Sequence, residues 1–170
     1  MRAQWGMSGR LWLRIGICLA LLPAAPALAN GWTINDTVSA LDGSRTYAAT
    51  LTSSNTIHTQ AGSDEQATLV VRCRYNRVES YIAWPQPLGS GALDMRWKTD
   101  NGNFITEVWS VSLDGSATFS ERTAAFLTRL ESAHHVTFQL SLPNFDMLLA
   151  DFNVTGADAV VKGAVAACHG

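Results

Sequence analysis

Residues 67–84 have the sequence ATLVVRCRYNRVESYIAW, and this stretch decides the fold that we predict for the chain. Apolar and polar side chains alternate on both sides of Asn76 and Arg77, which is typical of two strands with one buried face each. Asparagine tolerates a positive φ, so we expect a two-residue turn at Asn76 and Arg77. The stretch therefore predicts an antiparallel β-hairpin.

The position of this turn sets the register of the predicted hairpin. It places Arg74 opposite Glu79, where the two side chains would form a cross-strand ion pair. Because side chains alternate with period two, the hairpin has an inward and an outward face. The inward residues are Leu69, Val71, Cys73 and Ile82, and the outward residues are Arg72, Arg74, Glu79 and Tyr81.

Further strands are predicted where the same alternation recurs, over residues 46–51, 93–98, 107–113, 136–142 and 148–154. The last two form a second hairpin through residues 143–146. Residues 30–43 and 53–66 are polar and are expected to be loosely structured. With two helices added, the pattern predicts an α+β fold, an antiparallel sheet or sandwich-like core whose second helix is C-terminal.

Both helices are predicted from capping residues and helical spacing. The first begins with Ser120 as its N-cap and ends near Ala133. The second begins at Thr155, where Asp158 can return a hydrogen bond to the Thr155 amide. Its apolar stripe consists of Ala157, Val160, Val161, Ala164, Val165 and Cys168.

The N-terminal segment is typical of a secretory signal peptide. Arginines precede an apolar run over residues 11–22, two prolines follow, and the small-residue sequence Ala27-Leu28-Ala29 resembles a cleavage site. We expect residues 1–29 to be removed, leaving residues 30–170 as a single domain in the periplasm or secreted. A membrane anchor is the alternative, but Pro23 interrupts the apolar run too early. Lipidation at Cys18 is disfavoured by the residues before it.

Charge and cysteine content follow from this cleavage. Three of the 12 lysines and arginines leave with the signal, so nine face 14 acidic residues, a net charge of −5 that disfavours nucleic acid as a partner. Cys73 and Cys168 remain in an oxidising compartment, and we expect them to form a disulfide. A metal site is the alternative, but no histidine lies beside them at zinc-finger spacing.

An ordered series of short elements resembles the type VI secretion-associated VasI (TagO) family. The elements are Gly31-Trp32, residues 39–44, residues 67–77, residues 81–84, residues 109–115 with the order W-x-x-S-x-D, and a C-terminal part that ends at Cys168. The chain lacks the cysteine-bearing lead region of many relatives, and residues 96–100 replace their Arg-Ile-Asp strand. The resemblance implies a periplasmic or envelope accessory protein that binds an envelope or secretion-apparatus protein, with no established reaction chemistry.

A search for catalytic residues gives no constellation. His134 and His135 are adjacent and point to opposite faces of a strand, while His58 and His169 are expected to be solvated. No nucleophile elbow, metalloprotease helix or phosphate loop occurs. We therefore expect neither catalysis nor a metal or cofactor. An inhibitor or immunity-like protein, and an envelope hydrolase with an unrecognised motif, remain as alternatives.

The remaining candidate is a partner-binding surface built from arginines of the predicted sheet. Arg72, Arg74 and Arg96 are the candidate residues, because arginine is a frequent hot-spot residue in interfaces. Trp97 shares the apolar face of its strand and is expected in the core. In the structural alternative, Arg72 stacks on Tyr81 and Arg74 pairs with Glu79.

Overall fold

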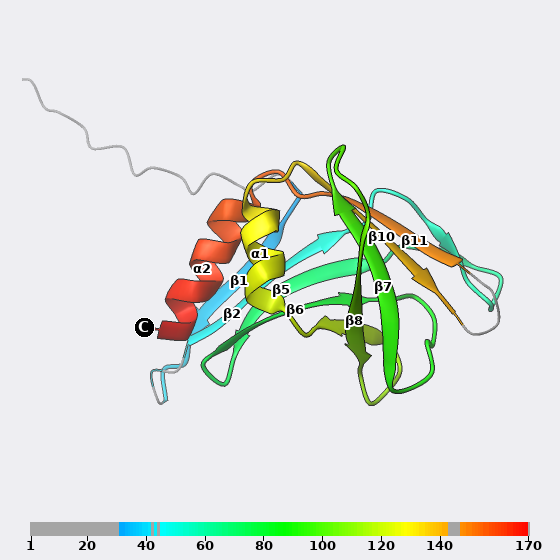
Figure 1. Cartoon of the computed structure of the whole chain (residues 1–170). Helices are drawn as coiled ribbons and strands as arrows, with labels where there is room; N and C mark the ends of the chain where they lie inside the picture. The colour runs from blue at the N-terminus through cyan, green and yellow to red at the C-terminus, as the bar shows by residue number, and fades with distance from the viewer. Residues whose placement is uncertain (1–30, 42, 44, 143–146, 170) are drawn as a thin grey trace, which may run out of the picture.

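The computed structural model describes residues 31–41, 43, 45–142 and 147–169. In this part of the chain, a nine-stranded antiparallel sheet has the order β1-β2-β5-β6-β9-β8-β7-β10-β11 (Figure 1). Its strands are β1 (Thr33–Val38), β2 (Arg45–Thr52), β5 (Thr68–Arg74), β6 (Arg77–Ala83), β7 (Ala92–Thr99), β8 (Ile105–Val111), β9 (Ala117–Ser120), β10 (His135–Ser141) and β11 (Met147–Asn153). A small second sheet pairs β3 (Ile57–His58) with β4 (Asp64–Glu65), and the helices are α1 (Thr123–Glu131) and α2 (Ala157–His169). The predicted α+β class, with a C-terminal second helix, is confirmed.

The described residues leave out two predicted segments, the signal peptide over residues 1–29 and the loop over residues 143–146. Within the described ranges, no helix has the length and apolar character needed to cross a membrane.

The strands that alternate clearly in sequence are all present, with ends shifted by one or two residues. The expectation of loose structure over residues 30–43 and 53–66 is wrong, because β1, β3 and β4 form there. All six residues of β1 are exposed, so the strand has no buried face and leaves no apolar alternation in the sequence. The short strand β9 was not predicted either.

The hairpin forms where predicted, but its turn lies one residue earlier. Tyr75 and Asn76 occupy the turn with φ values of 51° and 57°, as a two-residue turn with two positive φ values requires. The pairing moves with it: Arg72, not Arg74, lies opposite Glu79 and binds it at 2.8 Å. The cross-strand register shifts by two residues, from Arg74 to Arg72 opposite Glu79. Because side chains alternate with period two, a shift by two leaves the predicted inward and outward faces unchanged.

Both helix starts differ from the prediction. Ser120 is the last residue of β9 and not an N-cap; α1 begins at Thr123 without a side-chain cap. Before α2, the Thr155 amide donates to Asn153 Oδ1 at 3.2 Å, while Asp158 pairs with Lys162. These groups therefore have partners other than the ones that capping spacing suggests.

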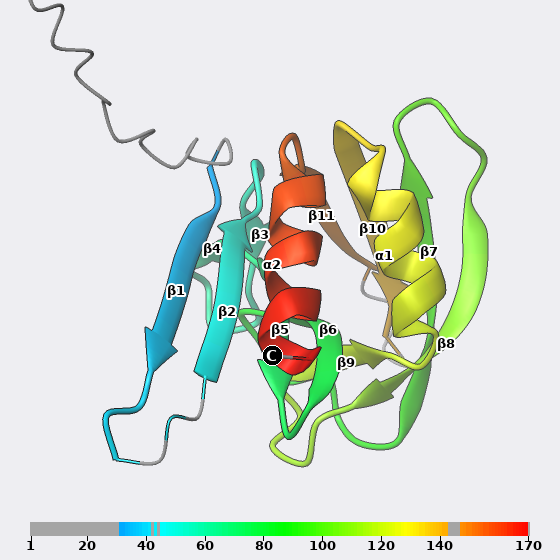
Figure 2. The ribbon, with the colours of Figure 1, turned by 90° about the vertical axis from the view of Figure 1, so that its left-hand side faces the viewer.

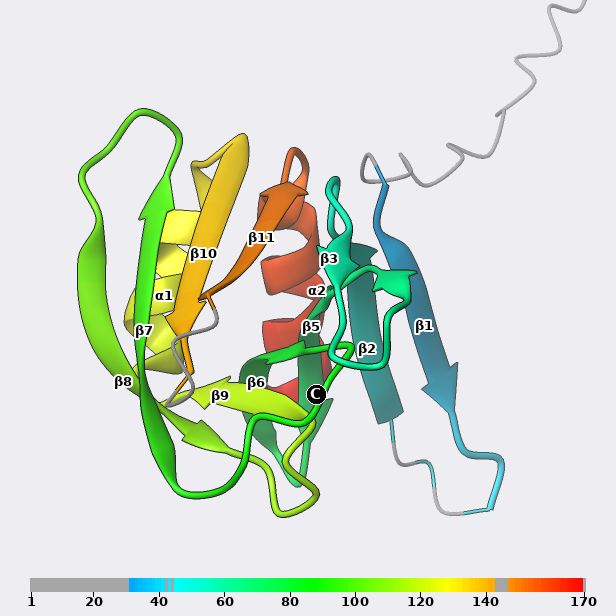
Figure 3. The ribbon, with the colours of Figure 1, turned by 90° about the vertical axis from the view of Figure 1, so that its right-hand side faces the viewer.

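The two helices lie side by side against one face of the sheet (Figure 2), and the opposite view shows the strands in front of them (Figure 3). Between these layers, Phe126 of α1 inserts among sheet aromatics, with ring centroids 5.1 Å from Trp97 and 5.6 Å from Trp109. Phe138 of β10 packs behind them. This cluster fixes α1 to the half of the sheet formed by β7, β8 and β10.

Helix α2 is attached to the other half of the sheet. The predicted disulfide is present and joins Cys73 of β5 to Cys168 at the end of α2. Nearer the start of the helix, the Tyr47 hydroxyl of β2 donates to the Val160 carbonyl at 3.0 Å. The apolar stripe is as predicted except that Val165 is 41% exposed, and Ala167 is buried instead.

The close approach of α2 to β2 requires glycine at position 163. A Cβ on Gly163 would lie 2.6 Å from the Tyr47 hydroxyl oxygen and 2.7 Å from Cε2 of the same ring. We expect Gly163→Ala to lower the free energy of unfolding by about 1–3 kcal/mol, although alanine favours a helix by about 1 kcal/mol. Denaturant unfolding measures it, and in a Tyr47→Ala background the same change should become neutral or stabilising. An increase in stability from Gly163→Ala alone would contradict this packing.

Candidate functional site

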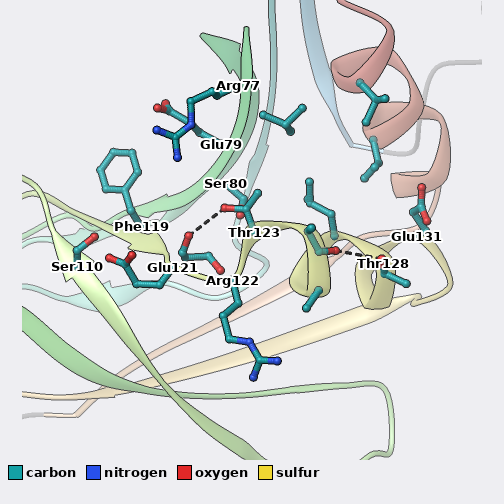
Figure 4. Close-up of a pocket in the computed structure, with 17 residues that line it drawn as sticks. Arg77, Glu79, Ser80, Ser110, Phe119, Glu121, Arg122, Thr123, Thr128 and Glu131 are labelled. Atoms are coloured by element: carbon teal, nitrogen blue, oxygen red, sulfur yellow. Dashed lines mark hydrogen bonds between the residues drawn. The ribbon is translucent and has the colours of Figure 1, made fainter. Parts of the chain in front are cut away.

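The sheet has an opening beside α1, where β6 extends further than its neighbour β9. Only the Tyr81–Ala83 part of β6 pairs with β9. The preceding part, from Arg77 to Ser80, pairs with β5 on one side and has no ladder partner on the other among the described residues. The chain leaves β9 at Ser120 and turns into α1 across this gap. An open groove of about 910 Å³ results, which we call the β6–α1 groove (Figure 4).

The floor and one wall of this groove are apolar. Leu127 of α1 and Val161 of α2 are buried at its base, and the exposed Val165 continues the wall outward along α2. Val78 and Phe119 contribute from β6 and β9. The volume falls in the range of small-ligand and peptide sites, and the exposed apolar wall can hold a side chain of a bound segment.

Charged side chains surround the groove. Glu79 is bound by Arg72 and Arg122 approaches Glu107 at 3.6 Å, so both already have a partner of opposite charge. Figure 4 shows Arg77 beside Glu79 on the β6 side and Arg122 directed away from β6. The mixed signs favour a ligand that carries polar and apolar groups together.

Two serine hydroxyls lie under this groove without a hydrogen-bond partner. Ser80 and Ser120 line it, are 1% and 8% exposed, and have no partner for Oγ within the described structure. They follow directly on the β6–β9 ladder, in which Tyr81 pairs with Phe119. Unpaired buried hydroxyls are costly, which marks this spot as polar and unsatisfied.

The first turn of α1 opens into the same groove. Thr123 Oγ1 donates to the Ser120 carbonyl at 2.9 Å and so is not a cap for the helix amides. The first helical hydrogen bond runs from the Phe126 amide to the Arg122 carbonyl. The amides of residues 123–125 have no acceptor in the described part of the chain, and no acidic residue lies in this turn. The donors at the positive end of the helix dipole therefore have no acceptor from the first turn itself.

The structure separates Arg96 from the other two predicted arginines, Arg72 and Arg74, which share the outward face of β5. Arg72 binds Glu79 and stacks on Tyr81 at 4.8 Å, as its structural alternative expects, while the predicted Arg74–Glu79 pair is absent. Arg74 instead lies over Tyr75, whose hydrogen bond raises the pKa of Arg74. Arg96 is on β7, four strand positions from β5 in the sheet. No single arginine patch forms.

Trp97 and the adjacent histidines His134 and His135 make hydrogen bonds within the sheet and its connections. Trp97 is buried and donates to Glu107 at 3.1 Å. The amides of His134 and His135 donate to Asp100, and both side chains are exposed. Across the described ranges, no group of three or more His, Cys, Asp or Glu side chains could hold a metal ion.

The W-x-x-S-x-D element forms the tight loop between β8 and β9. Asp114 Oδ1 accepts hydrogen bonds from the Ser112 hydroxyl at 2.5 Å and the Ser116 amide at 3.1 Å. These bonds, the Ser112 hydroxyl first, lower the pKa of Asp114 to about 2. The Ser112–Asp114 part of the element thus closes a turn, while Ser110, near its start on β8, lines the groove.

Sequence reasoning missed the β6–α1 groove because its residues carry ordinary local signals. Ser120 resembles a helix cap, and Ser80 resembles any polar residue of a strand. The one available sign is a misfit: Ser80 falls on the inward face of the hairpin, between Val78 and Ile82, where an apolar residue is expected.

Comparison with solved structures finds a similar fold in invasion-associated protein B from Bartonella henselae. The TM-score is 0.52 at 12% sequence identity, covering 80% of this chain and 91% of that chain. At this identity the likeness concerns the fold alone. No protein-family model matches the chain, and no curated protein matches it.

Proposed function

We propose that this chain is an exported, non-catalytic binding protein that holds an extended segment of a protein partner in the β6–α1 groove. The observation that carries the proposal is the free edge of β6 facing an exposed apolar wall. Backbone groups at an open edge accept a further strand, while adjacent pockets take alternate side chains. The disulfide supports export, because such bonds persist in oxidising compartments.

The resemblance to the VasI (TagO) family supports a more specific assignment, which we also propose: the partner is an envelope or secretion-apparatus protein, and the chain acts as an accessory in the periplasm. The shared elements over residues 67–77 and 81–84 build β5 and β6, and thus one wall of the groove. An accessory of this kind needs no cofactor, and its activity is recognition of the partner.

A charge placed on the apolar wall tests this function. Val165→Glu puts a carboxylate where the partner's side chain would pack, and we expect at least a tenfold loss of partner recovered from envelope extracts. Because Val165 is already exposed, the free energy of unfolding should change by less than about 0.5 kcal/mol.

The matched control is Ala166→Glu, one residue further along α2 and also exposed, but not part of the groove. It should retain the partner. Equal recovery with Val165→Glu and the native protein would contradict binding at this groove.

A further inference from the structure

In the part of the chain that the structure describes, the start of α1 presents unpaired hydrogen-bond donors at the β6–α1 groove. Three successive amides, those of Thr123, Ala124 and Ala125, lack an acceptor among the described residues, and the helix has no capping side chain. Amides at a helix N-terminus donate in one direction and carry a partial positive charge, so they bind carboxylate or phosphate oxygens.

A second and independent observation points to the same spot. Ser80 and Ser120 are more than nine-tenths buried, line the groove and have no partner for Oγ. Ser80 on β6 and Thr123, the first residue of α1, both line the groove and are labelled in Figure 4. Hydroxyls and helix amides are both hydrogen-bond donors, so the unsatisfied groups on the two sides of the groove suit one acceptor.

The surrounding charges permit an anion here. Glu79 is neutralised by Arg72 at 2.8 Å, Glu121 precedes the helix, and Glu131 is its last residue. None of the three lies in the first turn. Arg77 is exposed on the β6 side of the groove and adds a positive charge.

We infer that the groove binds the C-terminal end of a partner polypeptide, with its terminal carboxylate at the first turn of α1. This inference rests on the proposed function and specifies the ligand of the same groove. The segment lies along the free edge of β6 between Arg77 and Ser80, and its last side chain packs on Leu127, Val161 and Val165. A chain terminus fits both the free edge of β6 and the unpaired amides of α1, because its carboxylate continues the extended backbone. An acidic side chain instead branches away from that backbone.

The test measures binding of fluorescein-labelled hexapeptides by fluorescence anisotropy to the full mature protein. The probes share the sequence Gly-Ser-Thr-Thr-Ser followed by Val, Leu, Ile or Phe, and each is made with a free carboxylate and as the C-terminal amide. A third set carries Asp at the fourth position and an amide end. We expect a free-acid peptide to bind at least tenfold more tightly than its amide and than the Asp-containing amide.

Ala124 offers a matched pair of variants, because its side chain is exposed at the groove in the first turn of α1. Ala124→Asp places a carboxylate beside the helix amides, so it should weaken free-acid peptides at least tenfold. The melting temperature should stay equal or rise, since an acid in the first turn favours the helix. Ala124→Asn has the same shape without the charge and should bind within threefold of the native protein.

The results separate this inference from the proposed function. Equal binding of acids and amides, no binding of any free-acid peptide, or unchanged binding by Ala124→Asp would overturn the carboxylate site. Tighter binding of the Asp-containing amides would assign the site to an internal acidic side chain and overturn the terminal one. In each case, loss of the envelope partner in Val165→Glu would still support the groove as the binding surface.

Discussion

Replacing Cys73 and Cys168 together by alanine lowers the free energy of unfolding by about 2–5 kcal/mol. The bond joins β5 to the end of α2 across 95 residues of sequence, and a crosslink over so long a loop strongly restricts the unfolded chain. Helix α2 carries Val161 and Val165, so the groove should loosen together with the helix. Equilibrium denaturation of the double variant measures the stability change.

The control for this prediction is the native protein treated with a reducing agent, which should lose the same stability as the double variant. Non-reducing peptide mapping of protein isolated from the periplasm should recover the Cys73–Cys168 peptide pair. Two free thiols in that material, or full stability after reduction, would contradict the account.

Phe126→Ala is expected to cost about 3–5 kcal/mol of unfolding free energy, because it opens a cavity among the large core aromatics. Phe126 is 1% exposed and packs edge-on against Trp97 and Trp109. It is the α1 side chain that packs against both tryptophans of the sheet, so its loss should also loosen the wall of the groove. Thermal and denaturant unfolding both report the change.

Two further variants test whether the stability loss of Phe126→Ala comes from the aromatic cluster. Phe126→Leu retains much of the volume and should cost clearly less than the alanine variant. Thr128→Ala, on the exposed face of the same helix, should change stability by less than about 0.5 kcal/mol. If Phe126→Ala were no more destabilising than Thr128→Ala, the aromatic cluster would not be what positions α1.

Much of the fold could be predicted from the sequence where a strand has one buried and one exposed face. Strands β2, β5, β7, β10 and β11 alternate in this way, and the disulfide follows from two cysteines in a chain whose sequence predicts export. Strand β1 was not predicted, because both of its faces are exposed and its sequence does not alternate. The hairpin turn was misplaced because local propensity favours Asn76 as the first turn residue, whereas Tyr75 takes that position with a positive φ.

The candidate site could not be predicted, because it depends on how far neighbouring strands extend. The sequence contains no sign that β9 stops at Ser120 while β6 continues to Arg77, and the strand order that separates Arg72 from Arg96 is equally hidden. Periodicity assigns residues to faces but does not order strands that are distant in sequence. Apart from the polar misfit at Ser80, features that lie between elements are therefore hidden until the sheet is assembled.

Site-specific photocrosslinking tests the central claim, that the β6–α1 groove holds a protein partner. A benzophenone amino acid is introduced at position 165, on the groove wall, and in a second strain at position 166, on the neighbouring exposed face of α2. Illumination of intact cells should give an adduct with one envelope or secretion-apparatus protein, identified by mass spectrometry, from position 165 and not from position 166. Adducts of equal yield at both positions, or none at position 165, would contradict the account.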